Sequence, residues 1–200
     1  MALLGIAAFL LAAYLLGSLP SGYLICRWVA NIDVRTVGSK NIGATNVARS
    51  LGLSWGLLVL VMDMTKGALP VVVALGIWSG GTERNLLIVS FVALAAFFGH
   101  LSSVFLHFRG GKGVAIAFGI SLVIIPKAAL AAFVIFLVVT WIWRYVSLGS
   151  LAALLTLPVW AAVAGYNFVY LGLTSVFALF VVIRHRSNIH ALLQGKERRI

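Results

Sequence analysis

Residues 3–25 read LLGIAAFLLAAYLLGSLPSGYLI, an uninterrupted run without a charged side chain. A helix needs about 20 mostly apolar residues to cross the roughly 30 Å of hydrocarbon in a bilayer. The run is longer than the apolar core of a secretory signal and lacks the positive flank that precedes such a core. We therefore expect it to be retained as a first membrane span.

The rest of the chain repeats this pattern. Of 200 residues, 62% are hydrophobic and 10% are charged, whereas about a quarter are charged in a soluble domain. Six further apolar segments follow: 54–78, 86–106, 114–125, 128–143, 148–164 and 168–183. The composition predicts an all-α membrane protein with seven transmembrane helices in one bundle. With no long linker and no repeat, we expect residues 1–200 to form a single domain.

Positive charge sets the orientation, because Lys and Arg favour short cytoplasmic loops. The fourth and fifth segments are short and could be one broken span, but merging them would place Arg144 and the basic C-terminal cluster outside. Seven spans put the N-terminus outside, the C-terminus in the cytoplasm, and only Arg84 and Lys127 in outer loops. Twelve cations then lie inside: Arg27, Arg35, Lys40, Arg49, Arg109, Lys112, Arg144, Arg184, Arg186, Lys196, Arg198 and Arg199.

The net charge of +11 predicts anionic partners, either lipid headgroups or a phosphorylated ligand. The first inner loop, residues 33–52, is rich in hydrogen-bond donors and small residues. Glycines permit close approach of the backbone to a ligand, and an Arg fork fits phosphate oxygens. The alternative is a solvated loop with helix caps. The candidate binding residues are Gly38, Ser39, Asn41, Thr45, Asn46 and Arg49.

The second inner loop ends in Gly110-Gly111-Lys112-Gly113, directly before the fourth apolar segment. Glycine amides at a helix N-terminus form an anion site, and the helix dipole adds to the charge of Lys112. A Walker loop needs Ser or Thr after the Lys, where this chain has Gly113, so nucleotide hydrolysis is disfavoured. The alternative is a flexible turn whose Lys112 side chain extends to the headgroups.

The third inner turn carries Ser147 and Ser150, and the C-terminal segment carries Arg184-His185-Arg186 and Asn188. These groups also suit phosphate, although the serines could simply cap the sixth helix. Within the membrane, Asp63 and Lys66 are three residues apart, which favours a structural ion pair over a proton relay. We expect His100 to orient the second loop by hydrogen bonding.

Several chemistries are disfavoured. Cys26 is the only cysteine, so an intrachain disulfide and a thiolate metal cluster are excluded. His100 and His107 have no carboxylate beside them, so we expect no metal. Asp33 and Glu197 are the only acids in the inner loops, which leaves no His and Asp pairing for a hydrolase triad. Catalysis must then use cations, hydroxyls and amides on an activated substrate.

Three motifs stand in a fixed order along the chain. They are Gly38-Ser-Lys-Asn-Ile-Gly-Ala-Thr-Asn46 with Arg49, then Gly110-Gly-Lys-Gly113, then Arg184-His-Arg186 with Asn188. In this combination they resemble the bacterial acyl-phosphate-dependent glycerol-3-phosphate acyltransferases. The resemblance covers essentially the entire chain without departure in these motifs. It implies a seven-helix inner-membrane enzyme whose active site faces the cytoplasm. It also implies acyl transfer from acyl phosphate to the 1-hydroxyl of glycerol 3-phosphate, giving lysophosphatidic acid and phosphate.

An acyl phosphate is already activated, so no covalent nucleophile is required. We expect Gly110, Gly111, Lys112 and Gly113 to hold the donor phosphate, and Ser39 and Asn41 to stabilise charge at the carbonyl. Arg49, Thr45, Ser150 and Asn188 would hold glycerol 3-phosphate. A substrate phosphate would take the proton of the attacking hydroxyl, with His185 as the alternative base.

Two other classes compete with the enzyme: an anion or phosphate transporter, and a non-catalytic lipid-binding membrane protein. A transporter should carry polar groups at mid-membrane, where this chain has little besides Asp63 and Lys66. A non-catalytic lipid-binding protein would not require glycines on both sides of Lys112. We expect membrane lipids as the surroundings, a monomer, and neither a cofactor nor a nucleic-acid partner.

Overall fold

The computed structural model describes residues 3–199, and the regular structure within that range is helical. This confirms the all-α prediction. The chain divides into two compact units, Met1–Ile120 and Ser121–Ile200.

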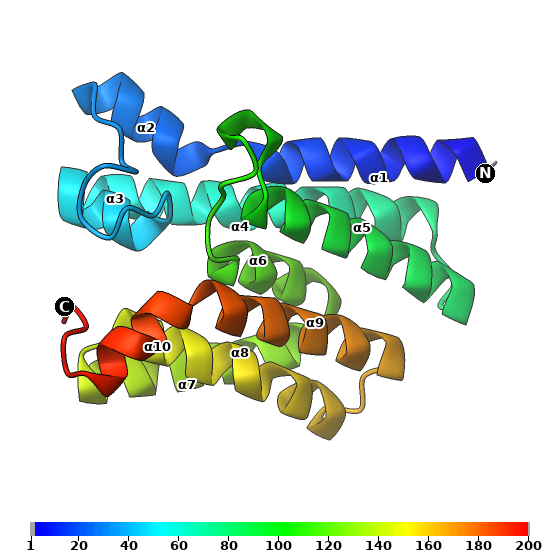
Figure 1. Cartoon of the computed structure of the whole chain (residues 1–200). Coiled ribbons are helices and arrows are strands. Elements are labelled where there is room, and N and C mark those ends of the chain that lie inside the picture. The colour runs from blue at the N-terminus through cyan, green and yellow to red at the C-terminus, as the bar shows by residue number, and fades with distance from the viewer. Residues whose placement is uncertain (1–2, 200) are drawn as a thin grey trace. The chain divides into compact units, whose positions relative to one another are not determined.

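Unit 1 contains α1 (Leu3–Ser18), α2 (Ser21–Ala30), α3 (Ala44–Leu51), α4 (Leu53–Ile77), α5 (Glu83–Leu101), the short 3-10 helix η1 (Val104–Leu106) and the start of α6 (Val114–Ile124). Helices α4 and α5 pack against α1, and α3 packs on α4 (Figure 1). Side chains at Gly17 and Gly99 would overlap the backbone of Ala96 and Tyr14 respectively, so α1 and α5 approach each other closely through these glycines.

The first predicted span is interrupted. Helix α1 ends at Ser18, and α2 begins at Ser21. Between them Pro20 has no amide hydrogen, so it cannot continue the helical ladder. The two helices together still give an apolar segment of 28 residues, Leu3–Ala30.

Unit 2 contains α7 (Pro126–Trp143), α8 (Val146–Val163), α9 (Phe168–Arg184) and α10 (Arg186–Leu193). Helix α8 lies between α7 and α9, and the chain bends by 60° from α9 into α10 (Figure 1). Helix α10 forms in the basic C-terminal segment, for which the sequence predicted no secondary structure. Helix α3 forms within residues 33–52, which were expected to be a loop.

Five helical segments of the described residues are long and apolar enough to cross a membrane: Leu3–Ala30, Leu53–Ile77, Glu83–Leu106, Pro126–Trp143 and Val146–Val163. The bent pair α9 and α10 would make a sixth. Helix α6, the predicted fourth span, has 11 residues and so extends only about 16 Å. Every predicted apolar segment contains a helix, but α6 is too short to cross a bilayer by itself.

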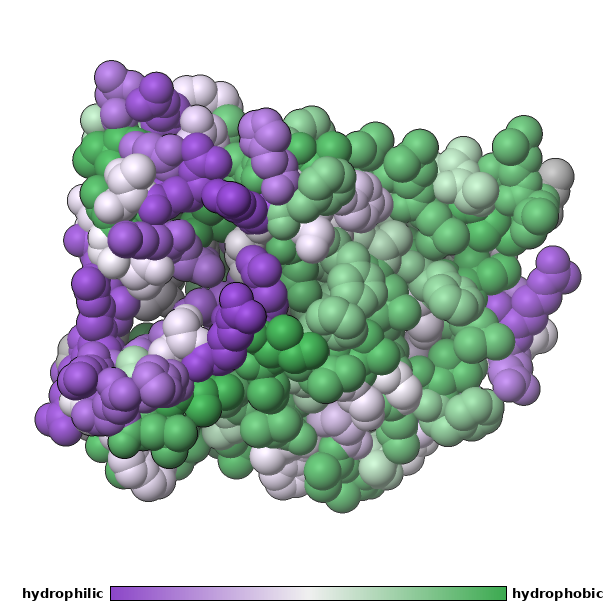
Figure 2. All heavy atoms as spheres, in the orientation of Figure 1, coloured by the Kyte–Doolittle hydropathy of each residue, from purple (hydrophilic) through white to green (hydrophobic). Residues whose placement is uncertain are grey.

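The surface has the character of a lipid-facing one. Large apolar side chains are widely exposed, among them Leu4 at 82% and Leu57 at 50% in unit 1 and Trp141 at 78% in unit 2. Within unit 1, hydrophobic residues cover α1, while hydrophilic residues gather around α2 and the loop that follows it (Figure 2). The chain is a helical integral membrane protein.

Candidate active site

The first inner loop is folded around the side chain of Asn46. This amide is 1% exposed, and its Nδ2 donates to the carbonyl oxygens of Val34 at 3.1 Å, Val37 at 3.1 Å and Asn41 at 2.9 Å. Its Oδ1 accepts from the backbone amide of Ser39 at 2.9 Å. Both ends of the amide are therefore used to hold the loop in one conformation.

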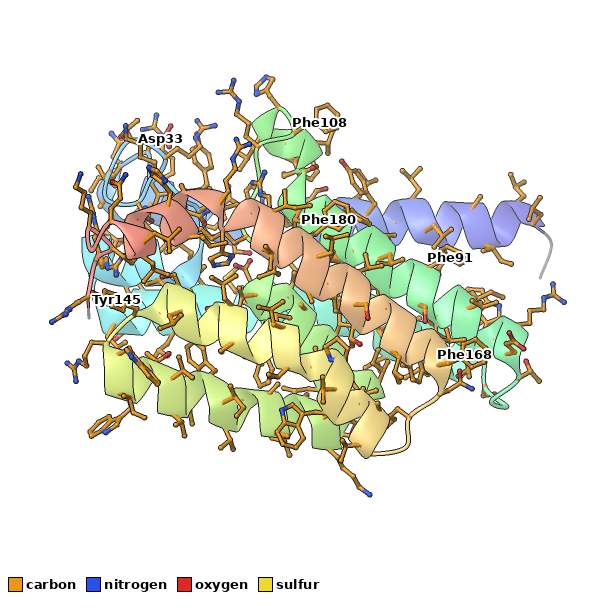
Figure 3. All side chains as sticks on the ribbon, turned by 60° about the horizontal axis from the view of Figure 1, so that its bottom comes forward. Asp33, Phe91, Phe108, Tyr145, Phe168 and Phe180 are labelled. Atoms are coloured by element: carbon orange, nitrogen blue, oxygen red, sulfur yellow. The ribbon has the colours of Figure 1, made fainter. Side chains whose placement is uncertain are left out.

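Apolar contacts anchor the same loop. Val34, Ile42 and Val47 are buried in a cluster with Cys26 and Val59, so each end of the loop is held by the core of unit 1. Burying one such aliphatic side chain contributes roughly 1.5–3 kcal/mol. Figure 3 shows Asp33 at the start of the loop.

Gly38 is required by this packing. Its φ is +59°, and a side chain there would overlap Asn46 Oδ1. Lys40 also has a positive φ of +56°, a rare conformation for a side chain other than glycine, so the loop turns sharply twice around Ser39.

Three further polar groups of this loop are candidate donors to a ligand: Ser39 Oγ, Asn41 Nδ2 and Thr45 Oγ1. Asn41 uses its Oδ1 to accept from the amide of Gly43 at 2.8 Å, which leaves the Nδ2 end for other donations. Ser39 and Arg49 are exposed, and Thr45 lies in the first turn of α3. The first-loop candidates thus lie together in one short segment of unit 1. The buried Asn46 side chain holds the backbone of this segment by its hydrogen bonds.

Asp33 is excluded as a general base. Its carboxylate accepts from Arg35 Nε at 3.0 Å and Nη2 at 2.7 Å. This side-chain hydrogen bonding lowers the pKa of Asp33 to about 2, although desolvation by burial acts to raise it. A carboxyl group with so low a pKa holds no proton near neutral pH and is too weak a base to take one.

The second loop returns tightly against the end of α5. The amides of Gly110 and Gly111 donate to the carbonyl oxygens of Leu101 at 3.1 Å and His100 at 3.0 Å. Side chains at these two glycines would overlap His100 and Leu101, and Gly113 has a φ of +91°. This bond joins the backbone of His100 to the second loop, and the orienting role expected of the His100 side chain stays a prediction.

Helix α6 begins at Val114, directly after Gly113, whose carbonyl accepts from the amide of Ala117 at 3.0 Å. The glycine run therefore lies at a helix N-terminus, as the sequence predicted. The dipole of α6 adds positive potential beside Lys112, which is partly exposed. This is the arrangement that favours an oxyanion.

In unit 2, His185 lies at the junction of α9 and α10 and is 2% exposed. Its Nδ1 is 2.8 Å from the carbonyl oxygen of Val181. Since a carbonyl only accepts, Nδ1 carries the hydrogen, and the lone pair of the neutral ring is on Nε2.

Glu197 organises the other polar groups of unit 2. Its Oε1 accepts from Ser147 Oγ and from Asn188 Nδ2, each at 2.7 Å. Ser150 Oγ donates to the carbonyl of Val146 at 2.8 Å, so neither serine caps α8. Sequence reasoning assigned no role to Glu197. The sequence signal that could have identified Glu197 is that it is the one acidic residue in a basic tail.

The predicted site residues fall into two groups. Unit 1 holds the first loop and the glycine run, and unit 2 holds Ser150, His185 and Asn188. Each group is folded by contacts inside its own unit.

Long apolar helices joined by polar, glycine-rich loops define an integral membrane protein with a structured polar site. The profile of the family described as glycerol-3-phosphate acyltransferase matches residues 7–195. The glycerol-3-phosphate acyltransferase of Syntrophotalea carbinolica is 46% identical over 190 residues, covering 95% of each chain. That of Myxococcus xanthus is 44% identical over 193 residues, covering 96% of this chain and 98% of the relative. The chain belongs to the glycerol-3-phosphate acyltransferase family.

Solved structures agree. The crystal structure of PlsY (YgiH), an integral membrane glycerol 3-phosphate acyltransferase, in its glycerol 3-phosphate form matches with a TM-score of 0.90 at 38% identity, covering 98% of this chain and 96% of that one. Its lysophosphatidic acid form matches with a TM-score of 0.88 at 37% identity, covering 98% and 95%. The chain is an acyltransferase of glycerol 3-phosphate.

Proposed function

We propose that the acyl donor is an acyl phosphate, and that the chain transfers its acyl group to the 1-hydroxyl of glycerol 3-phosphate. The observation that carries this proposal is the glycine run at the N-terminus of α6, beside Lys112. An acyl phosphate presents a dianionic head that suits such a site, whereas the thioester of an alternative donor has no phosphate at the reacting carbon. The solved relatives with glycerol 3-phosphate and lysophosphatidic acid support the acceptor and the product.

In the reaction, the 1-hydroxyl oxygen attacks the acyl carbonyl, the bond from that carbon to the phosphate oxygen breaks, and inorganic phosphate leaves. Lys112 and Gly113 would hold the donor phosphate and stabilise it as it leaves. The amides of Gly110 and Gly111, which the sequence assigned to this phosphate, instead donate to the carbonyl oxygens of Leu101 and His100 and fix the loop. Ser39 Oγ and Asn41 Nδ2 would donate to the carbonyl oxygen as negative charge develops there.

Glycerol 3-phosphate would be held by Arg49, Thr45, Ser150 and Asn188, the residues that the family resemblance suggested. The hydrogen bond from Asn188 to Glu197 supports an orienting role for that carboxylate. The contacts of Asn46 and the φ of Gly38 favour a supporting role for both in the first loop, in place of the direct substrate contact that the sequence suggested.

A phosphate oxygen of a substrate would accept the hydroxyl proton. The low pKa of Asp33 supports this, because it removes one of the two inner-loop carboxylates as a base. His185 Nε2 is the alternative acceptor. If His185→Ala abolished turnover while both substrates still bound normally, the substrate-assisted version would be wrong.

We also propose seven crossings in the inner membrane, with the N-terminus outside and both the C-terminus and the active site on the cytoplasmic side. The distribution of Lys and Arg supports this orientation. The family profile spans residues 7–195 and hence both units, which supports a single domain. Because one chain supplies every proposed site residue, a monomer suffices.

The donor is tested by offering the purified protein glycerol 3-phosphate with either an acyl phosphate or the matching acyl thioester. We expect lysophosphatidic acid from the acyl phosphate alone. Formation from the thioester at an equal rate would refute the donor assignment and leave the acyltransferase class intact.

A further inference from the structure

A charged network lies buried in the membrane-spanning part of unit 1. Asp63 and Lys66 on α4 are 2% and 5% exposed, and Lys66 Nζ is 2.8 Å from Asp63 Oδ1. This confirms the predicted ion pair. A single buried charge here would be strongly unfavourable, so the pair neutralises itself. Charge neutralisation alone would not require Asp63 and Lys66 to contact other residues, yet Lys66 contacts Leu19 and Asp63 lies beside His100.

Lys66 also holds the break between α1 and α2. Its ammonium donates to the carbonyl oxygen of Leu19 at 2.6 Å, next to Pro20. The start of the second loop is tied to the same region, because Ser103 Oγ donates to the carbonyl of Ser18 at 2.5 Å and Tyr14 OH to that of Ser102 at 2.7 Å. One end of the second loop is thus fixed to the break that Lys66 stabilises.

Asp63 reaches toward the other end of that loop through His100. His100 Nδ1 is 3.8 Å from Asp63 Oδ1, which is too long for a hydrogen bond but makes the two buried side chains direct neighbours. The His100 ring is 3% exposed and fills the space that a side chain on Gly111 would need. Its carbonyl accepts the Gly111 amide at 3.0 Å. A shift of His100 would therefore move the glycine run.

We propose that Asp63, Lys66 and His100 are positioning residues for acyl transfer, which place the Gly110–Gly113 run through contacts at both ends of the second loop. The proposal rests on the phosphate-binding function proposed for that run. We assign these three residues no substrate contact of their own; they act by fixing where the glycine run and Lys112 lie.

The first measurement is the effect of Lys112→Ala on the KM values for acyl phosphate and glycerol 3-phosphate. It shows which KM rises when the proposed phosphate site at the Gly110–Gly113 run is damaged. Asp63→Asn and Lys66→Met should raise the same KM as Lys112→Ala and lower kcat/KM by about 10- to 100-fold, since small displacements at a reacting centre have effects of this size. Asp63→Glu keeps the charge and should recover part of the loss. Ser90→Ala, another buried polar position on the neighbouring α5, should keep wild-type kinetics.

The double variant Asp63→Leu with Lys66→Met separates positioning from stability. Replacing both partners of a buried ion pair with apolar residues of similar volume is often neutral for stability, whereas removing one partner is not. We expect the double variant to unfold near the wild-type temperature in detergent and still to show the raised KM. A folded double variant with wild-type KM values would overturn the proposal, and would reduce the pair to charge neutralisation.

Failure of the underlying function gives a different result. If Lys112→Ala itself had wild-type KM values for both substrates, the phosphate site at the glycine run would be refuted. If Lys112→Ala raised a KM and none of the Asp63 or Lys66 variants did, only the positioning role would be refuted.

Discussion

At the residue scale, one buried amide sets the geometry of the first loop. Asn46 makes four hydrogen bonds to backbone groups of residues 34–41, and no other residue type of its size offers both donors and acceptor at the tip. Ser39 and Asn41 owe their positions to it. The identity of this residue thus matters through the loop it folds.

Asn46→Asp keeps the shape and the acceptor for Ser39 but removes both N–H donors. The buried carbonyls that Asn46 served would face a carboxylate, so we expect a loss of about 1–3 kcal/mol in unfolding free energy and strongly reduced activity. Thermal unfolding in detergent and acyl transfer measure the two effects. Ser50→Ala, which removes a single hydroxyl bond to the Asn46 carbonyl, is the matched control. An Asn46→Asp protein with normal stability and turnover would contradict this role.

Gly111 tests the second loop in the same way. Gly111→Ala places a methyl group against the His100 ring, so the loop must move and we expect activity to fall about tenfold or more. Gly76→Ala in α4, where nothing lies within 4 Å of the added carbon, should leave acyl transfer unchanged. Equal activity in the two variants would show that the close approach at Gly111 has no functional consequence.

Residue types and spacing predicted which residues gather in the loops, because glycine, small polar residues and cations mark anion sites. They did not separate ligand-facing groups from supporting ones. Asn46 and Thr45 are neighbours with similar hydrogen-bonding capacity, and only the fold buries the first and leaves the second partly exposed. That difference depends on contacts between residues distant in sequence.

At the element scale, hydropathy predicted where each apolar helix lies to within a few residues. It missed the division of the first span, because Pro20 is compatible with a kinked helix as well as with a break. It also missed α3, whose polar face resembles loop composition. Charge identified the tail only as basic, whereas α10 and Glu197 give it a defined structure.

The tail provides an element-scale prediction. Glu197→Ala removes the acceptor shared by Ser147 and Asn188, so the tail should detach from α8 and Asn188 should lose its orientation. We expect faster proteolysis of the C-terminus and a KM for glycerol 3-phosphate raised about tenfold. Lys196→Ala, at the adjacent exposed position, is the control. An unchanged KM together with an intact tail would refute the role of Glu197.

At the scale of the whole molecule, the short α6 decides the topology. If it crosses, Lys112 and Lys127 lie on opposite sides of the membrane. If it does not, they share a side and every later loop changes sides. Apolar length gives five or six crossings, and charge distribution favours seven.

Single cysteines in a Cys26→Ser background distinguish these topologies. An impermeant maleimide applied to intact cells should label Arg84→Cys and Lys127→Cys, and should label Lys40→Cys and Lys196→Cys only after permeabilisation. Protection of Lys127→Cys in intact cells would contradict the seven-span arrangement.

The central claim is that the purified chain transfers an acyl group from acyl phosphate to glycerol 3-phosphate using the phosphate site at Lys112. The direct measurement is phosphate release from acyl phosphate, with and without glycerol 3-phosphate, by wild-type protein and by folded Lys112→Ala. We predict release that depends on the acceptor and equals lysophosphatidic acid formed, and almost none from the variant. Release that ignores glycerol 3-phosphate, or a fully active Lys112→Ala, would contradict the claim.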